Sequence, residues 1–382
     1  MKKGVKESFR NIFFLGGSSF FNDIGSEMIT PIIPFYTIAL GGTGVAVGLI
    51  SGLREGLSSL FKIFGGWFSD RIGKRKPFVF LGYFLSVIFK LFLALAHSWQ
   101  AIISFISLER FGKLRDAPRD VIITQSTKKT GKGFALHQTM DTSGAIIGTL
   151  LVIFLFWKLQ LEMQTIIFIA AGISALSLIP LFFVKEVDGK KTKLKLLKSI
   201  KKISPRLKYF VFVSSVFTLA NFGLYMFLLL LVKEQTGNII IPLIVYAVFS
   251  LVYAVFAVPF GNLSDKIGRK KVLLIGYVLF FLIALTFVFL HNIFILISLF
   301  ILYGLVYAIT QPNQKALVSD LSGKMKGTAL GFYGSVTGVV NILGGLIAGI
   351  LWDINYVLMF VFISVVAFFS IVLLGFVKEK RG

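Results

Sequence analysis

The sequence contains no cysteine and only 9 prolines and 3 histidines among its 382 residues. Without cysteine the chain can form no disulfide, no thiolate metal site and no cysteine nucleophile. Charge is also scarce, because 15% of the residues are charged while 56% are hydrophobic and the mean hydropathy is +0.86. A soluble protein needs a charged surface, so this composition excludes an ordinary soluble domain and indicates a protein embedded in a membrane.

The signatures of common enzyme and nucleotide-binding classes do not occur either. The sequence has no Gly-x-Ser-x-Gly, His-Glu-x-x-His or Walker pattern. Its histidines, His97, His137 and His291, are too widely spaced to suggest a shared metal ion. We therefore expect no enzymatic activity, no cofactor and no dedicated metal site.

Positive charge is present in excess, since 40 lysines and arginines accompany 17 acidic residues and give a formal net charge of +23. Such an excess is typical of proteins that bind nucleic acid or lie against anionic membranes. Here the basic residues lie in short segments between apolar runs and do not form a separate basic domain. We therefore expect the lipid bilayer, and not nucleic acid, to be the partner of this charge.

Apolar runs long enough to cross a bilayer as helices recur along the whole chain. They predict an all-α membrane protein with twelve transmembrane helices in two six-helix bundles, residues 1–184 and 209–382, joined by a basic cytoplasmic linker at 185–208. The predicted spans are 11–37, 44–68, 77–96, 99–125, 133–156, 162–184, 208–232, 239–262, 271–290, 293–316, 327–350 and 354–377.

The positions of the basic residues support this count and predict the orientation. If both termini are cytoplasmic, seven cytoplasmic segments hold 31 of the 40 lysines and arginines, and the loops on the opposite side hold almost none. This is the charge asymmetry expected of a multi-pass protein of the cytoplasmic membrane. In the linker, Leu194, Leu196, Leu197 and Ile200 fit a short interfacial helix, and a plain charged tether fits equally well.

A short charged turn occurs twice and relates the two bundles to each other. Residues 65–77 read GGWFSDRIGKRKP and residues 260–271 read FGNLSDKIGRKK, followed by FVFLGY and VLLIGY. A second internal sequence similarity relates residues 131–148 to residues 325–344. The duplication predicts two related halves. Within the first copy, Gly73 suits a left-handed turn residue, and Asp70 can cap backbone N–H groups or pair with an arginine.

This turn resembles the loop signature of the major facilitator superfamily, and the twelve spans extend the resemblance over nearly the whole chain. The pattern G-x-x-x-D-R/K-x-G-R/K-R/K matches at Gly66, Asp70, Arg71, Gly73, Lys74 and Arg75, and again at Gly261, Asp265, Lys266, Gly268, Arg269 and Lys270. The resemblance implies a secondary transporter whose substrate cavity opens to each side in turn. It also implies that Asp70 belongs to a cytoplasmic gate. From their depth along the span, Arg115 and Arg119 lie level with this turn and are expected to belong to its partner network.

Ionisable residues within the spans are candidates for the transport site, because each costs about 2.5–3.5 kcal/mol at membrane depth. They are concentrated in the first half. A deep set is Asp23, Glu27, Arg54, Glu55, Lys90, Glu109 and Arg110, to which we add Lys113 and Asp141, and a shallow set is Arg115, Asp116, Arg119 and Asp120. The second half offers polar and aromatic candidates, Asn221, Tyr225, Gln311 and Asn341.

Asp23 and Glu27 are the preferred candidates for a carboxylate that carries a proton. They are four residues apart and therefore share one helix face. The alternative is that they form static ion pairs that hold the bundle together. His137 and Asp141 have the same spacing, which fits either a proton relay or a packing pair. Proline predicts bends near Pro118 and near Pro31 and Pro34.

We therefore predict a monomeric, proton-coupled secondary transporter that exports a small hydrophobic or amphipathic compound. The deep cations and carboxylates leave open the transport of an organic anion or a metal ion in either direction. A transport-inactive sensor or assembly partner is the alternative from another functional class.

Overall fold

The computed structural model describes residues 2–127, 129–187, 203–289, 292–323 and 325–377, and within these ranges every regular element is a helix. The chain divides into two compact units. One unit contains the residues up to Gly41 and those from Leu57 to Leu194, and the other contains Gly42–Gly56 and the residues from Lys195 onward. The linker helix suggested for Leu194, Leu196, Leu197 and Ile200 lies outside the described residues.

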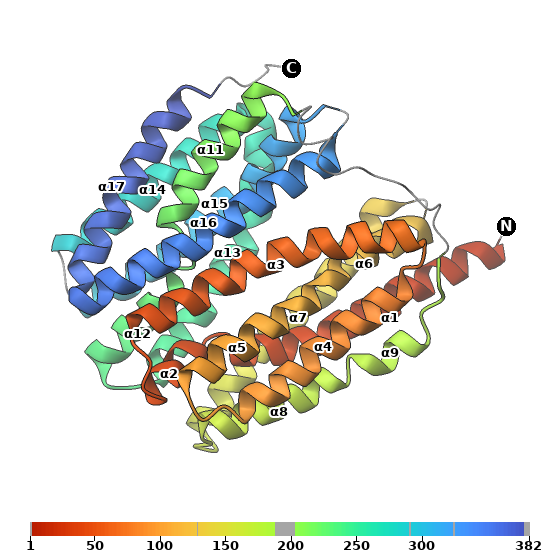
Figure 1. Cartoon of the computed structure of the whole chain (residues 1–382), viewed down its shortest axis with the longest axis horizontal. Coiled ribbons are helices and arrows are strands. Elements are labelled where there is room, and N and C mark those ends of the chain that lie inside the picture. Colours follow the sequence, from red (N-terminus) through yellow and green to blue (C-terminus); the bar gives the residue numbers. More distant parts are fainter. Residues whose placement is uncertain (1, 128, 188–202, 290–291, 324, 378–382) are drawn as a thin grey trace. The chain divides into compact units, whose positions relative to one another are not determined.

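The first unit is a bundle of long helices in which α1 packs on α7 and α8, and α4 packs on α8 and η1 (Figure 1). Its elements are α1 (Lys2–Ile29), α2 (Ile33–Ala39), the second part of α3 (Gly44–Ile72), α4 (Lys76–Ala94), α5 (Trp99–Glu109), the 3-10 helix η1 (Arg110–Arg115), α6 (Asp116–Ser126), α7 (Thr130–Trp157), α8 (Met163–Ala175) and α9 (Leu178–Phe182).

A compact apolar core joins α1, α4, α6 and α9 at the end of this unit that carries the charged loop. It consists of Ile12, Leu15, Val79, Tyr83, Ile122, Ile123, Leu181 and Val184, each at most 2% exposed. Van der Waals packing of these side chains holds the helices together, because lipid offers no hydrophobic driving force between them. The core also fixes the ring of Tyr83, whose hydroxyl enters the polar network described below.

The second unit pairs α13 with α15, α14 with α15 and α17, and α11 with α16 and α17. Its elements are the first part of α3, α11 (Pro205–Ala220), α12 (Tyr225–Thr236), α13 (Ile240–Ile267), α14 (Arg269–Phe289), α15 (Ile293–Leu321), α16 (Lys326–Ile354) and α17 (Tyr356–Gly375). The helix α3 is therefore shared, because its first turns pack with the second unit and its later turns with the first.

Several predicted spans are interrupted. The span 11–37 is broken between α1 and α2, which confirms the bend expected at Pro31 and Pro34. The span 99–125 is wrong as one continuous helix, because η1 separates α5 from α6. The cause is Pro118, which cannot donate the backbone hydrogen bond to residue 114 and so favours an irregular turn there.

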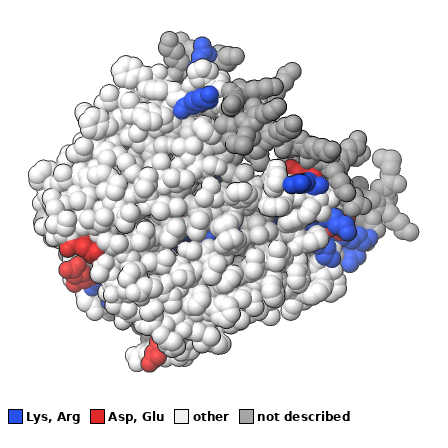
Figure 2. Space-filling model, in the orientation of Figure 1, with Lys and Arg blue, Asp and Glu red and all other residues white. Residues whose placement is uncertain are grey.

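The surface of the helices suits a lipid environment. Large apolar side chains are widely exposed, for example Phe13, Phe182 and Phe376 at 57%, 68% and 71%. In Figure 2 the broad surface in view is mostly uncharged, and the coloured residues form small clusters near its margins. Since soluble proteins rarely leave so much apolar surface in water, these faces are membrane-facing.

Nine helices among the described residues are long and apolar enough to cross a membrane: 76–94, 130–157, 163–182, 205–236, 240–267, 269–289, 293–321, 326–354 and 356–375. The three other expected spans correspond to α1 with α2, to α3, and to α5 with η1 and α6. These three segments contain most of the charged residues that lie within the predicted spans. The multi-pass character is therefore supported, and the count of twelve stays a prediction.

Candidate functional site

The first charged turn lies between α3 and α4 and is closed by its own side chains. Gly73 has φ +81°, which confirms the left-handed turn predicted for it. Arg75 Nη2 donates to Asp70 Oδ1 at 2.5 Å, and Ser69 Oγ donates to the carbonyl of Gly66 at 3.0 Å. Arg75 is only 4% exposed, so Asp70 supplies the negative charge that this buried cation needs.

The second turn, between α13 and α14, repeats this arrangement. Gly268 has φ +100°, and Arg269 pairs with Asp265. Ser264 Oγ donates to the carbonyl of Gly261 at 2.7 Å, as Ser69 does to Gly66. The second pair is more open, because the side chain of Asp265 is 60% exposed whereas that of Asp70 is 35% exposed. Both copies thus contain a glycine turn and an Asp–Arg pair, although the arginine follows Asp70 by five residues and Asp265 by four, and the pair is less exposed in the first copy.

We expect Asp70→Asn to slow transport about fivefold while the protein still folds. The substitution removes the carboxylate that pairs with Arg75. Solvent screens this pair, because the side chain of Asp70 is 35% exposed, so its contribution to stability is about 1 kcal/mol. Asp265→Asn is the matched control, because its more exposed carboxylate predicts a smaller effect. Initial transport rates in proteoliposomes test this, and equal rates for wild type and Asp70→Asn would remove Asp70 from the gate.

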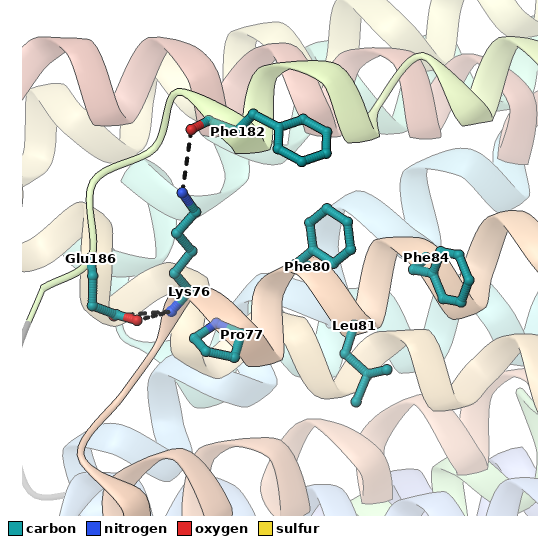
Figure 3. A pocket seen from close by; sticks show the side chains of 7 residues that line it. All are labelled: Lys76, Pro77, Phe80, Leu81, Phe84, Phe182 and Glu186. Atoms are coloured by element: carbon teal, nitrogen blue, oxygen red, sulfur yellow. Dashed lines mark hydrogen bonds between the residues drawn. The ribbon is translucent and has the colours of Figure 1, made fainter.

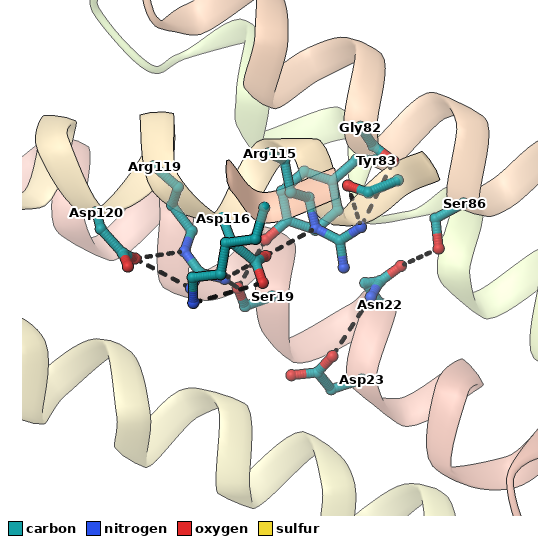
Figure 4. A network of polar contacts seen from close by, with 12 residues as sticks. Ser19, Asn22, Asp23, Gly82, Tyr83, Ser86, Arg115, Asp116, Arg119 and Asp120 are labelled. Atoms are coloured by element: carbon teal, nitrogen blue, oxygen red, sulfur yellow. Dashed lines mark hydrogen bonds and ion pairs between the residues drawn. The ribbon is translucent and has the colours of Figure 1, made fainter. Parts of the chain in front are cut away.

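A buried lysine lies at the centre of the deep polar network of the first unit (Figure 4 shows the part around Asn22 and Ser86). Lys90 of α4 is 2% exposed, and its ammonium donates to Asn22 Oδ1 at 3.0 Å and to the carbonyl of Asn22 at 3.1 Å. A third bond goes to Ser174 Oγ at 2.9 Å. The three donors of the ammonium are therefore matched to three acceptors from α1 and α8.

A carboxylate on α5 extends this network. Glu109 is 7% exposed and accepts from Ser86 Oγ at 2.7 Å, while Arg110 Nη2 lies 2.6 Å from Glu109 Oε2. Ser86 also donates to Asn22 Oδ1 at 3.2 Å. Asn22 Nδ2 in turn donates to Asp23 Oδ1 at 3.3 Å. Acidic and basic groups from three helices thus form one buried, hydrogen-bonded system.

The shallow set forms a second network around η1 and α6 (Figure 4). Arg115 is 3% exposed, lies 4.3 Å above the ring of Tyr83 and donates to the carbonyl of Gly112 at 3.0 Å. Arg119 pairs with Asp120 at 3.1 Å and with Asp116 at 3.7 Å. The arginines predicted near the loop are therefore paired within their own segment, whereas Asp70 pairs with Arg75.

Ser19 connects this shallow network to α7. Its Oγ lies 2.6 Å from the hydroxyl of Tyr83 and 3.0 Å from Nε2 of His137, and Arg119 Nη1 donates to it at 3.4 Å. His137 Nδ1 lies 3.5 Å from Asp141 Oδ2. The other carboxylate oxygen of Asp141 is buried and has no hydrogen-bond partner among the described residues. His137 and Asp141 are therefore a contacting pair inside a polar chain.

The corresponding place in the second unit is neutral. Tyr277, which follows the second charged turn as Tyr83 follows the first, accepts from Gln314 Nε2 at 2.8 Å. Tyr333 donates to Gln314 Oε1 at 2.9 Å. In both units a tyrosine hydroxyl therefore contacts a network of polar side chains. This network contains arginine, histidine and aspartate only in the first unit.

Aromatic rings fill the interior of the second unit. The ring of Tyr303 lies 5.6 Å from Phe249, 5.8 Å from Phe280 and 5.1 Å from Tyr307, and its hydroxyl donates to Asn221. These spacings are typical of favourable aromatic pairs. Glu55 of α3 belongs to this unit as well.

The first turns of α3 pack backbone to backbone on α16. A Cβ atom on Gly48 would lie 2.0 Å from the carbonyl oxygen of Gly345, so no side chain fits there. At the start of α3, Asp353 accepts hydrogen bonds from the backbone N–H groups of Gly44 at 2.6 Å and Val45 at 3.0 Å. A carboxylate at a helix N-terminus is stabilised by unpaired N–H groups and by the helix dipole. Glycine here therefore permits close packing of the two helices.

The remaining predicted candidates are placed by the helix that carries them and by their burial. Arg54 is 7% exposed on α3, Glu27 is half-buried on α1 and Lys113 is half-buried in η1. In the second unit Tyr225 contacts Tyr246, while Gln311 and Asn341 are half-buried on α15 and α16.

Sequence reasoning missed the neutral partners, which are Ser19, Asn22, Tyr83, Ser86, Ser174 and Gln314, and also Asp353. Two signals point to some of them. Asn22 and Ser86 are polar residues inside apolar spans, and Tyr83 recurs as Tyr277 after each charged turn.

Paired charges inside membrane helices, two related halves and duplicated loops define the architecture of a secondary transporter. The profile of the Major Facilitator Superfamily matches residues 15–238 and 211–382. The chain belongs to this superfamily of transporters.

The most similar relatives agree with this assignment. The uncharacterized MFS-type transporter MJ1317 of Methanocaldococcus jannaschii is 44% identical, over 97% of this chain and 96% of the relative. The multidrug resistance protein MdtH of Proteus mirabilis is 27% identical over 81% of this chain and 78% of its own length.

Solved structures share the fold at low identity. A structure of a variant of the nucleoside transporter NupG has a TM-score of 0.83 at 14% identity, covering 96% of this chain and all of that one. The human organic anion transporter MFSD10 has a TM-score of 0.70 at 16% identity, covering 96% and 99% of the two chains.

Proposed function

We propose that the protein is a proton-coupled secondary transporter that exports a small hydrophobic or amphipathic compound. This proposal rests on a difference in charge and aromatic content between the two units. The first unit holds buried, linked acids and bases, whereas the second is mainly aromatic and has Arg54 and Glu55 of α3 as its charged groups at this depth. The first therefore suits proton transfer and the second suits an apolar solute.

The proton site is proposed at Asp23 and Asp141. Asp23 is one of the two preferred candidates from sequence, together with Glu27, and it is linked to the buried network through Asn22. The unpartnered buried oxygen of Asp141 is costly for an ionised carboxylate but less so for a neutral acid. Water entering from one side would let this pair release its proton, so proton occupancy can follow the opening of the site.

The substrate class is proposed from the aromatic interior. Rings of tyrosine and phenylalanine offer apolar contact area together with hydroxyl groups, which suits amphipathic solutes of varied shape. Relatives named multidrug resistance proteins MdtH and MdtG support this choice, although their identity of 23–27% makes the support general.

An organic anion is the second candidate, because the deep set contains three cations, Lys90 and Arg110 in the first unit and Arg54 on the part of α3 that belongs to the second. A metal ion has less support, since no three histidine or acidic residues converge within the described parts of the chain. A transport-inactive sensor remains the alternative from another class, and it predicts no flux under any gradient.

The setting is proposed from the charge asymmetry of the sequence. The chain would lie in the cytoplasmic membrane as a monomer, with both termini and both charged turns in the cytoplasm. In the transport cycle the first part of α3 would separate from α16 and expose the aromatic interior, and the charged turns would open and close the opposite side.

We expect Asp141→Asn to abolish substrate accumulation driven by a pH gradient while leaving downhill exchange intact. Asparagine keeps the size of the side chain but cannot release a proton. The assay loads proteoliposomes with a fluorescent amphipathic dye and follows its flux with and without an imposed pH gradient. Asp120→Asn, at the more exposed end of the network, is the matched control. Gradient-driven accumulation by Asp141→Asn would contradict proton coupling at this residue. If the wild type showed no flux of any dye or anion, the result would favour the transport-inactive sensor.

A further inference from the structure

A groove of about 520 Å³ lies on the outer surface of the first unit, between α4 and α9. Its lining consists of Lys76, Pro77, Phe80, Leu81, Phe84, Phe182 and Glu186 (Figure 3). The ring of Phe80 packs edge-on against Phe182 at 5.6 Å and lies parallel to Phe84 at 6.5 Å. The groove is therefore apolar along most of its length and is shaped by rings that brace one another.

One end of the groove is polar. Lys76 Nζ donates to the carbonyl of Phe182 at 3.3 Å, which uses one of its three N–H donors. The carboxylate of Glu186 accepts from the backbone N–H groups of Arg75 at 2.8 Å and Lys76 at 3.0 Å. Because Glu186 serves as the cap of α4, its charge is balanced there, and the ammonium of Lys76 gives this end a positive character.

The position of the groove restricts what can occupy it. Residues 76–94 and 163–182 are both apolar enough to cross the membrane, so the aromatic part of the groove faces hydrocarbon. The polar end adjoins the charged turn 69–76, where Lys74 is exposed at the boundary with the lipid headgroups. An occupant must therefore be apolar along its length and anionic at one end, which is the chemistry of an acidic phospholipid.

We propose that this groove is a binding site for an anionic phospholipid of the leaflet next to the 69–76 turn. One acyl chain lies along Phe80, Phe84 and Phe182, and the phosphate accepts hydrogen bonds from Lys76. The proposal concerns the lipid-facing surface and does not depend on which compound the protein transports.

The site is testable with the purified full-length protein by native mass spectrometry. The probes are dioleoyl phosphatidylglycerol and dioleoyl phosphatidylcholine, each titrated into the detergent-solubilised protein. We expect the wild type to retain one phosphatidylglycerol about fivefold more tightly than phosphatidylcholine, the size of effect expected for one basic residue near the membrane surface. Lys76→Gln should remove this preference, whereas the exposed Lys132→Gln should keep it. Glycerol phosphate, which lacks acyl chains, should not displace the lipid.

Filling the groove tests the acyl-chain contact separately. Leu81→Trp, at a position that is 43% exposed, should lower retention of both lipids at least fivefold. Ile275→Trp is the control, because Ile275 holds the equivalent place in the repeated motif and is 48% exposed on α14. If Leu81→Trp fails to fold, Phe182→Ala removes one wall of the groove without adding volume. Equal lipid retention by the groove variants and the control, or an unchanged headgroup preference in Lys76→Gln, would overturn the proposal.

Discussion

Replacing Gly48 by leucine is expected to reduce transport more than tenfold. Gly48 and Gly345 leave no room for a side chain, since a Cβ on either one would lie 2.0–2.1 Å from the carbonyl oxygen of the other. Leucine therefore forces the first turns of α3 away from α16, at a cost of about 1–3 kcal/mol or more from overpacking. The transporter would then be held away from the state in which these two helices are in contact.

Cysteine labelling can measure this separation directly, because the natural chain has no cysteine. Ser51 is 1% exposed and donates to the carbonyls of Phe222 at 3.1 Å and Gly223 at 2.9 Å. A Ser51→Cys probe should react slowly with a membrane-impermeant maleimide, and much faster when Gly48→Leu is added. Gly172→Leu is the matched control, because Gly172 lies on a membrane helix with open space around it. Transport and labelling that are alike in Gly48→Leu and Gly172→Leu would refute this role of the contact.

Replacing Glu109 by leucine is expected to destabilise the protein by about 3–5 kcal/mol and to abolish transport. The substitution removes the carboxylate that lies 2.6 Å from Arg110, and it removes the nearer of the two acceptors of the Ser86 hydroxyl, at 2.7 Å. Removing one partner of a buried ion pair costs more than the pair itself contributes, because the remaining charge stays in an apolar environment. Thermal unfolding in detergent, together with flux in proteoliposomes, measures both effects.

A double replacement separates stability from function. Glu109→Leu with Arg110→Leu removes both charges, so we expect it to recover most of the lost stability while transport remains absent. Asp120→Asn is the control for loss of a carboxylate in a less buried pair. A Glu109→Leu protein that is as stable as the wild type, or a double variant that transports normally, would show that this pair is neither structural nor needed for transport.

Local chemistry explains what could be predicted before the structure. The length of an apolar run decides whether it can cross a bilayer, and the basic residues between runs predict orientation, so spans and halves are readable from sequence. The same holds for the charged turns, because Asp70, Gly73 and Arg75 lie within six residues of chain. The position of η1 could not be predicted. The sequence shows that Pro118 removes one backbone hydrogen bond, but it does not show which preceding residues leave the α-helical conformation.

The partners of the deep charges could not be predicted, because they come from distant helices. The alternative for Asp23 and Glu27 was a static ion pair with Arg54, Lys90 or Arg110, and the hydrogen bonds of Lys90 are to the neutral Asn22 and Ser174. Many pairings of acids and bases satisfy the same periodicity, and only the packing of α1, α4 and α8 selects one. The assignment of the first part of α3 to the second unit was equally hidden, since it depends on contacts between residues about 300 positions apart.

The sequence by itself therefore determined that this is a membrane protein of two related halves with a repeated charged turn and with charges concentrated in the first half. These properties follow from composition, run length and short-range geometry. Only the tertiary structure decided which charges meet, which helices touch through glycine and where a lipid-facing groove opens, because these depend on side chains that the chain brings together across the bundle.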